Sequence, residues 1–140
     1  MSSATAGPVS APQAPRWMLW TGWLLSIAVV GQLLASAWVR ATHHSSAVAE
    51  IVTSYGYPES AILLIVVAEC ALVVLYLVPQ TSVVAAIVMT GYLGGAVATH
   101  LRIGDAARAA IPLVVGILAW AGLYLRDARL RQLIPFRRSA

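Results

Sequence analysis

Four long apolar segments dominate the pattern of hydrophobic and polar positions along this chain. Crossing the hydrocarbon core of a bilayer takes about 20 residues of helix, and each segment is close to that length. Short polar or proline-containing stretches separate the segments. The pattern therefore predicts an all-α protein, an integral membrane four-helix bundle. The expected spans are residues 17–39, 60–78, 82–101 and 109–125.

The segments that flank and connect the spans have their own patterns. Residues 1–16 are mostly small residues and proline, which indicates a disordered N-terminal tail. Residues 17–125 make up the transmembrane domain, and residues 126–140 form a basic tail. In the longest connection, residues 40–57, apolar positions recur at helical spacing, so we expect a short amphipathic helix at the membrane interface. Those positions are Val48, Ile51 and Val52.

The first span also admits a second interpretation. Ala35-Ser36-Ala37 resembles a signal-peptidase site. The apolar run is longer than a signal core of about 7–15 residues, so we favour a membrane span. Tryptophans near its two ends fit the interfacial aromatic belts of membrane proteins. These are Trp17, Trp20, Trp23 and Trp38.

Composition agrees with a membrane protein, and the distribution of arginines predicts its orientation in the membrane. Hydrophobic residues make up 60% of the chain and charged residues only 10%, whereas soluble domains carry about 25% charged residues. The net charge is +4, and the arginines cluster at span ends, so we expect contact with the lipid bilayer and not with nucleic acid. The N-terminus, the 78–82 turn and the C-terminus hold six arginines and the other side three. Both termini are therefore expected in the cytoplasm.

Glu69 lies near the midpoint of the second span, where an ionisable side chain costs about 2.5–3.5 kcal/mol to insert. Such a residue faces the bundle interior and needs a partner. Gln32 lies at a similar depth in the first span, and Tyr92 lies near mid-depth in the third. These three form a candidate buried polar site. Its role is either proton or ligand handling, or a neutral carboxyl that anchors the bundle by hydrogen bonds.

A second candidate site lies at the outer end of the third span. His100, Arg102 and Asp105 follow one another there, and Glu59 begins the second span at a similar depth. At 1.5 Å per residue, His100 lies roughly 12 Å from the depth of Glu69, so we expect no direct contact between them. Either the four residues bind a headgroup, quinone or partner, or the basic residues cap the third helix while Gly104 and Asp105 make the turn.

The third span has small residues four positions apart, a spacing typical of helices that pack closely in membranes. We therefore expect close helix contact along this span. The pairs are Gly91 with Gly95, and Gly94 with Ala98.

Several classes of chemistry have no support. Cys70 is the single cysteine, so a disulfide or a CxxC pair within the chain is excluded. The histidines show no metal-ligand spacing, and adjacent His43 and His44 point apart on a helix. We predict no metal, and no nucleophilic or phosphate-binding motif is present.

The ordered motifs resemble the DoxX-like family of small membrane proteins over residues 17–125. They are Gly56-Tyr57-Pro58, the central Glu69, Pro79 and the run Ala98–Asp105. The resemblance implies a four-helix bundle in the bacterial inner membrane, with Glu69 and His100 as its usual polar positions, followed by Gly104 and Asp105. Better-known members include a subunit of an archaeal thiosulfate:quinone oxidoreductase and a membrane partner in a redox-stress complex.

Three functions follow as alternatives. The first, which we favour, is a non-catalytic membrane subunit or scaffold linked to redox or stress processes, with a redox-protein partner or a second copy of itself. The second is a quinone-reactive oxidoreductase component, the one alternative that brings a cofactor. The third is a small transporter, which a central carboxylate suits.

Overall fold

A computed structural model describes residues 15–133, and its regular elements in that range are helical. In order they are α1 (Arg16–Thr42), α2 (His44–Ala47), the π-helix η1 (Val48–Ser54), α3 (Ser60–Leu77), α4 (Ser82–Arg102), α5 (Ala106–Arg126) and α6 (Ala128–Leu133). Residues 1–14 of the expected N-terminal tail and residues 134–140 of the basic tail lie outside the described residues.

The four expected spans are confirmed as four helices, α1, α3, α4 and α5, each long and apolar enough to cross a membrane. Two of their ends differ from the expectation by three residues, and the other ends differ by one residue at most. Helix α1 continues to Thr42 and so includes Arg40, which was expected in the outer connection. Helix α5 begins at Ala106, three residues early, because the Asp105 carboxylate accepts a hydrogen bond of 3.0 Å from the Arg108 amide and caps it. Pro112 lies inside α5.

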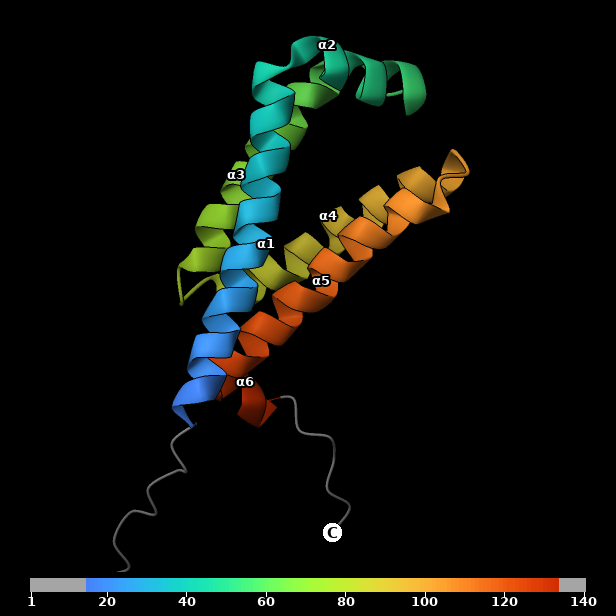
Figure 1. Cartoon of the computed structure of the whole chain (residues 1–140). Helices are drawn as coiled ribbons and strands as arrows, with labels where there is room; N and C mark the ends of the chain where they lie inside the picture. The colour runs from blue at the N-terminus through green and yellow to red at the C-terminus, as the bar shows by residue number, and fades with distance from the viewer. Residues whose placement is uncertain (1–14, 134–140) are drawn as a thin grey trace, which may run out of the picture.

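The four long helices form two antiparallel pairs, α1 with α3 and α4 with α5 (Figure 1). The pairs meet where α1 begins and α5 ends, and they separate toward the end of the molecule that carries η1 (Figure 1). Helices α1 and α5 make the most extensive contact between the pairs. The helix pairs are therefore in contact at one end of the bundle, the closed end. At the other end, the open end, they stand apart, and the space between them is called the wedge.

Glycine allows the close contact at the closed end. A Cβ added to Gly22 would lie 2.8 Å from the Arg126 backbone nitrogen and 2.9 Å from the Gly122 carbonyl oxygen. Beside this contact, fully buried Tyr76 donates a hydrogen bond of 2.7 Å to the Ala119 carbonyl and so ties α3 to α5. The main apolar core surrounds these contacts. Helices α1 and α5, and not α4, thus supply the close backbone approach.

The small residues of α4 do not make the expected close helix contact within the described chain, although α4 packs along α5 through other residues. A Cβ added to Gly91, Gly94 or Gly95 would meet nothing within 4 Å. Gly91 and Gly95 line a cavity, and Gly94 faces a groove on the outer side of α4 and α5. The helix pairs separate at this level, so small residues here leave open space instead of a contact.

At the open end, η1 extends from the α1–α3 pair toward the ends of α4 and α5 (Figure 1). Its Ile51 is buried against Ile62 of α3, as the expected amphipathic helix requires. On the other side, a hydrogen bond of 2.8 Å joins the Tyr57 hydroxyl to Thr99 of α4. Because the Thr99 hydroxyl already donates to the Gly95 carbonyl, the Tyr57 hydroxyl is the donor. Arg102 donates to the Tyr55 carbonyl. These hydrogen bonds therefore tie the connection after η1 to α4.

Candidate functional site

Glu69 is the centre of a buried polar network inside the wedge. Its side chain is 3% exposed, and three groups donate to it. The Ser36 hydroxyl and the Tyr92 hydroxyl each lie 2.8 Å from Oε1. The Arg40 guanidinium lies 3.1 Å from Oε1 and 3.3 Å from Oε2. A carboxylate inside a membrane bundle is stabilised by an opposite charge and donors of this kind.

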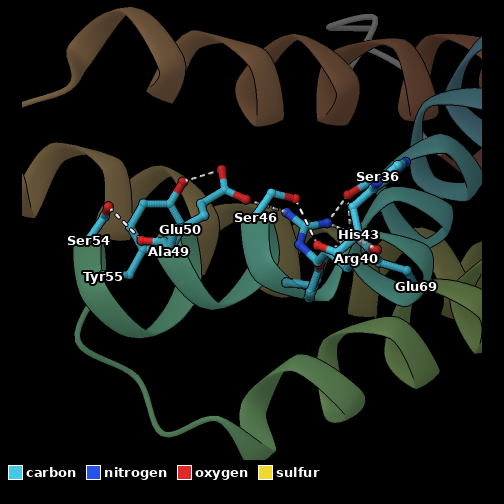
Figure 2. A network of polar contacts seen from close by, with 10 residues as sticks. Ser36, Arg40, His43, Ser46, Ala49, Glu50, Ser54, Tyr55 and Glu69 are labelled. Atoms are coloured by element: carbon cyan, nitrogen blue, oxygen red, sulfur yellow. Dashed lines mark hydrogen bonds and ion pairs between the residues drawn. The ribbon is translucent and has the colours of Figure 1, made fainter.

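Arg40 connects the buried carboxylate to the interface. Figure 2 shows its side chain running from the end of α1 toward Glu69 on one side and Glu50 of η1 on the other. The Glu50 carboxylate lies 4.0 Å from Arg40 and is 39% exposed, so this second ion pair is weak. Arg40 also donates to Ser36, one helical turn before it.

The π-helical geometry of η1 shapes the outer part of the network. A π-helix turn contains more residues than an α-helix turn, and π-turns are frequent at functional sites. Here the wider turn brings residues five apart onto one face, so the Tyr55 hydroxyl donates a hydrogen bond of 2.8 Å to Glu50. Burial and this hydrogen bond raise the pKa of Tyr55 to about 12, so it stays a neutral donor at physiological pH. Its ring packs edge-on against His100 at 5.3 Å.

Two cavities lie in the wedge, on either side of this network. The first, of about 460 Å³, lies between α3 and α4 beneath η1. The second, of about 400 Å³, lies between α1, α4 and α5. Four residues border both cavities, namely Arg40, Tyr92, Ala96 and His100. The rest of the first cavity is mostly apolar, with exposed Leu64 among its lining residues. The first cavity therefore extends from a polar wall, formed by Arg40, Tyr92 and His100, to the lipid-facing surface.

The protein does not supply hydrogen-bond partners for all the polar groups of this wall. Arg40 Nε and His100 Nδ1 are buried and have no hydrogen-bond partner within residues 15–133. The imidazole of His100 has only its ring contact with Tyr55 in that range. Most buried polar groups in native proteins are paired, so unpaired ones beside a cavity are typical of a site that a bound molecule completes.

Two of the three residues expected at the buried site come together. Tyr92 donates a hydrogen bond to Glu69, as its place in the candidate buried site requires. Gln32 does not contact Glu69. It is exposed on α1 and borders only the second cavity, while Ser36, one turn later, occupies the place expected for Gln32.

The outer candidates do not form one cluster. His100 borders both cavities, whereas exposed Arg102 lies 5.8 Å over the Tyr57 ring. Asp105 caps α5 and pairs with Arg108 at 3.4 Å. Glu59 precedes α3 and borders a separate space. Gly104 adopts a φ of 78° at the end of α4, the geometry of a helix C-cap, so the turn follows the capping alternative.

Arg40, the strongest partner of Glu69, was not predicted from the sequence. The sequence pattern placed Arg40 outside the span, and Ser36 entered only as part of the Ala35-Ser36-Ala37 motif. A signal was present nonetheless, because Gln32, Ser36 and Arg40 are four residues apart and so lie on one face of a helix. A polar stripe on an otherwise apolar span indicates a face turned toward other polar groups.

A family model described as the DoxX-like family matches residues 24–122, which include all the residues of the Glu69 network and both cavities. Neither the curated proteins nor the solved structures gave a match to this chain.

Proposed function

The chain belongs to the DoxX-like family of membrane proteins, and on that premise we propose that it is a membrane subunit that binds a lipophilic molecule with a polar head, of the quinone class. The observation that carries the proposal is the incompletely paired polar wall of Arg40, Tyr92 and His100 at the end of an apolar cavity. Such a cavity, of a few hundred Å³ with few polar groups, is typical of small-molecule sites.

The residues present fit a quinone. Its carbonyl oxygens are acceptors, and the His100 imidazole and the Arg40 guanidinium both carry donors. Its isoprenoid tail is apolar, and the first cavity leads past Leu64, Ile65 and Ala68 to the lipid-facing surface. A bound quinone would supply reversible two-electron chemistry, while the protein's own residues orient the head and exclude water from it.

A subunit role follows from the chain's own side chains. Cys70 is its single cysteine and lies exposed on α3, so dithiol chemistry within one chain is excluded. In this proposal a partner protein supplies the electrons for the quinone. This combines the subunit and the quinone-reactive alternatives, and both termini, with the basic tail, lie in the cytoplasm in this proposal.

A pair of neighbouring glycines allows a direct test by titration with decylubiquinone, followed by native mass spectrometry. Gly95→Leu places a side chain in the first cavity, and we expect it to weaken binding at least tenfold. Gly94→Leu is the matched control, because it fills the groove on the outer side of α4 with the same side chain. Neither glycine has an atom within 4 Å of an added Cβ, so both variants should fold.

The same titration also distinguishes a ligand-binding function from a scaffold function. If decylubiquinone binds the native protein no better than Gly95→Leu, the ligand proposal is wrong. Co-purification of a partner in that case would leave the scaffold function as the better description.

A further inference from the structure

A third cavity, of about 350 Å³, lies at the closed end of the bundle, away from the Glu69 network. It is bordered by the start of α1, the turn between α3 and α4, and the junction of α5 and α6. The lining residues are Trp23, Pro79, Gln80, Ser82, Leu123, Arg126, Asp127 and Arg129. Because these residues lie at the ends of membrane-spanning helices, the cavity is at the depth of lipid headgroups.

Arg126 is held rigidly at this cavity. Its guanidinium lies 4.8 Å over the Trp23 ring and 4.6 Å over the Tyr76 ring. One terminal nitrogen donates a hydrogen bond of 2.7 Å to the Tyr76 carbonyl. Its Nε is buried and unpaired within the described chain. A guanidinium fixed by aromatic rings, with donors to spare, is an arrangement that suits binding of an oxyanion.

The charges around the cavity select the kind of anion. Arg126 and Arg129 are opposed by Asp127, so one positive charge remains. The Asp127 Oδ1 accepts from the backbone amides of Arg129 and Leu130, at 2.8 Å and 3.4 Å. This carboxylate disfavours an anion with two charges, whereas an anion with one charge neutralises the site.

We propose that this cavity binds a singly charged phosphodiester, the phosphate of an anionic phospholipid headgroup. Arg126 and Arg129 bind the phosphate oxygens, and exposed Gln80 is a further donor at the rim. The site is separate from the quinone site in place, charge and ligand.

Native mass spectrometry of the full chain in a neutral detergent tests the proposal, with phosphatidylglycerol, phosphatidylcholine and inorganic phosphate as probes. We expect phosphatidylglycerol to bind at least tenfold more tightly than phosphatidylcholine, whose choline cation the site repels. Arg129→Gln should weaken that binding roughly tenfold or more, the effect of losing one charge-assisted hydrogen bond. Arg126→Lys keeps the charge but loses the planar donor set, and should weaken it as well.

Arg131→Gln is the matched control. Arg131 carries the same charge on the same short helix, but it donates to the Tyr124 and Leu125 carbonyls and does not border the cavity. Binding unchanged by Arg131→Gln and lost in Arg129→Gln supports the site, and Arg129 is exposed, so this variant should fold. Equal losses in both, or no preference for phosphatidylglycerol, overturn it. Inorganic phosphate that competes at millimolar concentration supports the phosphate site, and a lack of competition assigns the affinity to the whole lipid.

Discussion

At the scale of single residues, the pairing of Arg40 with Glu69 decides the chemistry of the wedge. Burying either charge alone in a membrane bundle is costly, and the two are tolerated because they lie 3.1 Å apart. The remaining capacity of the carboxylate is met by Ser36 and Tyr92. Arg40 also borders both cavities, so the residue that neutralises Glu69 is also available to a ligand.

This pairing predicts a specific pattern of stability. Arg40→Met should lower the free energy of unfolding by about 3–5 kcal/mol, because it leaves a buried carboxylate without its counter-charge. Adding Glu69→Gln to that variant should restore part of the loss, since Gln is neutral and its carbonyl still accepts from Ser36 and Tyr92. Reversible SDS unfolding in mixed micelles, followed by tryptophan fluorescence, measures both values.

Glu50→Gln is the control for this cycle. Glu50 lies 4.0 Å from Arg40 and is 39% exposed, so its removal should change stability by less than about 1 kcal/mol. Equal losses for Arg40→Met and for the double variant would contradict a charge pair between Arg40 and Glu69.

The residues of this site could be predicted only in part. The cost of a charge in the middle of a span identified Glu69, and depth along the helix identified Tyr92. Arg40 was missed because sequence distance to the span end does not show where a long, flexible side chain reaches. Glu50 and Tyr55 pair through a π-turn, which has no reliable signature in a single sequence.

At the scale of elements, glycine has opposite roles in α4 and at the contact of α1 with α5. In α4, Gly91 and Gly95 leave open space that becomes a cavity wall. At the contact of α1 with α5, Gly22 and Gly122 allow two backbones to meet. The spacing of glycines in a sequence therefore shows where a helix surface is flat, but which neighbour covers that surface depends on the tertiary arrangement.

The closed end predicts a clear difference between two glycine variants of α1. Gly22→Ala should lower the free energy of unfolding by about 1–3 kcal/mol, because its Cβ would lie 2.8 Å from a backbone nitrogen that cannot move easily. Gly31→Ala meets nothing within 4 Å and should change it by less than about 1 kcal/mol. The same mixed-micelle unfolding assay compares them, and similar values for both would argue against the close contact.

At the scale of the whole molecule, hydropathy predicted four spans but not how they are arranged. The spans are apolar on nearly all sides, since lipid and protein neighbours are equally apolar, so hydrophobicity does not mark the buried face. Exposed apolar side chains such as Leu63, Val74 and Ile117 show this directly. The separation of the two helix pairs, and hence the cavities, could not be read from the pattern.

Orientation in the membrane remains a prediction that cysteine labelling can check. In a Cys70→Ala background, Thr53→Cys lies at the η1 end and Gln80→Cys lies beside Arg126 at the closed end. An excess of arginine keeps an end in the cytoplasm. A membrane-impermeant maleimide should therefore label Thr53→Cys in cells with a permeabilised outer membrane, and Gln80→Cys only after lysis. The reverse pattern would place the termini outside.

The Arg40–Glu69 pair also has a consequence for biosynthesis. Arg40 is made 29 positions before its counter-charge, and the two reside on different helices. Helices that fold in a membrane commonly insert one by one and associate afterwards. Until α3 has entered the bilayer, the arginine at the end of α1 must stay with lipid headgroups or water. The final depth of α1 is therefore reached only when α3 arrives, which makes the first helix dependent on a later one for its completed insertion.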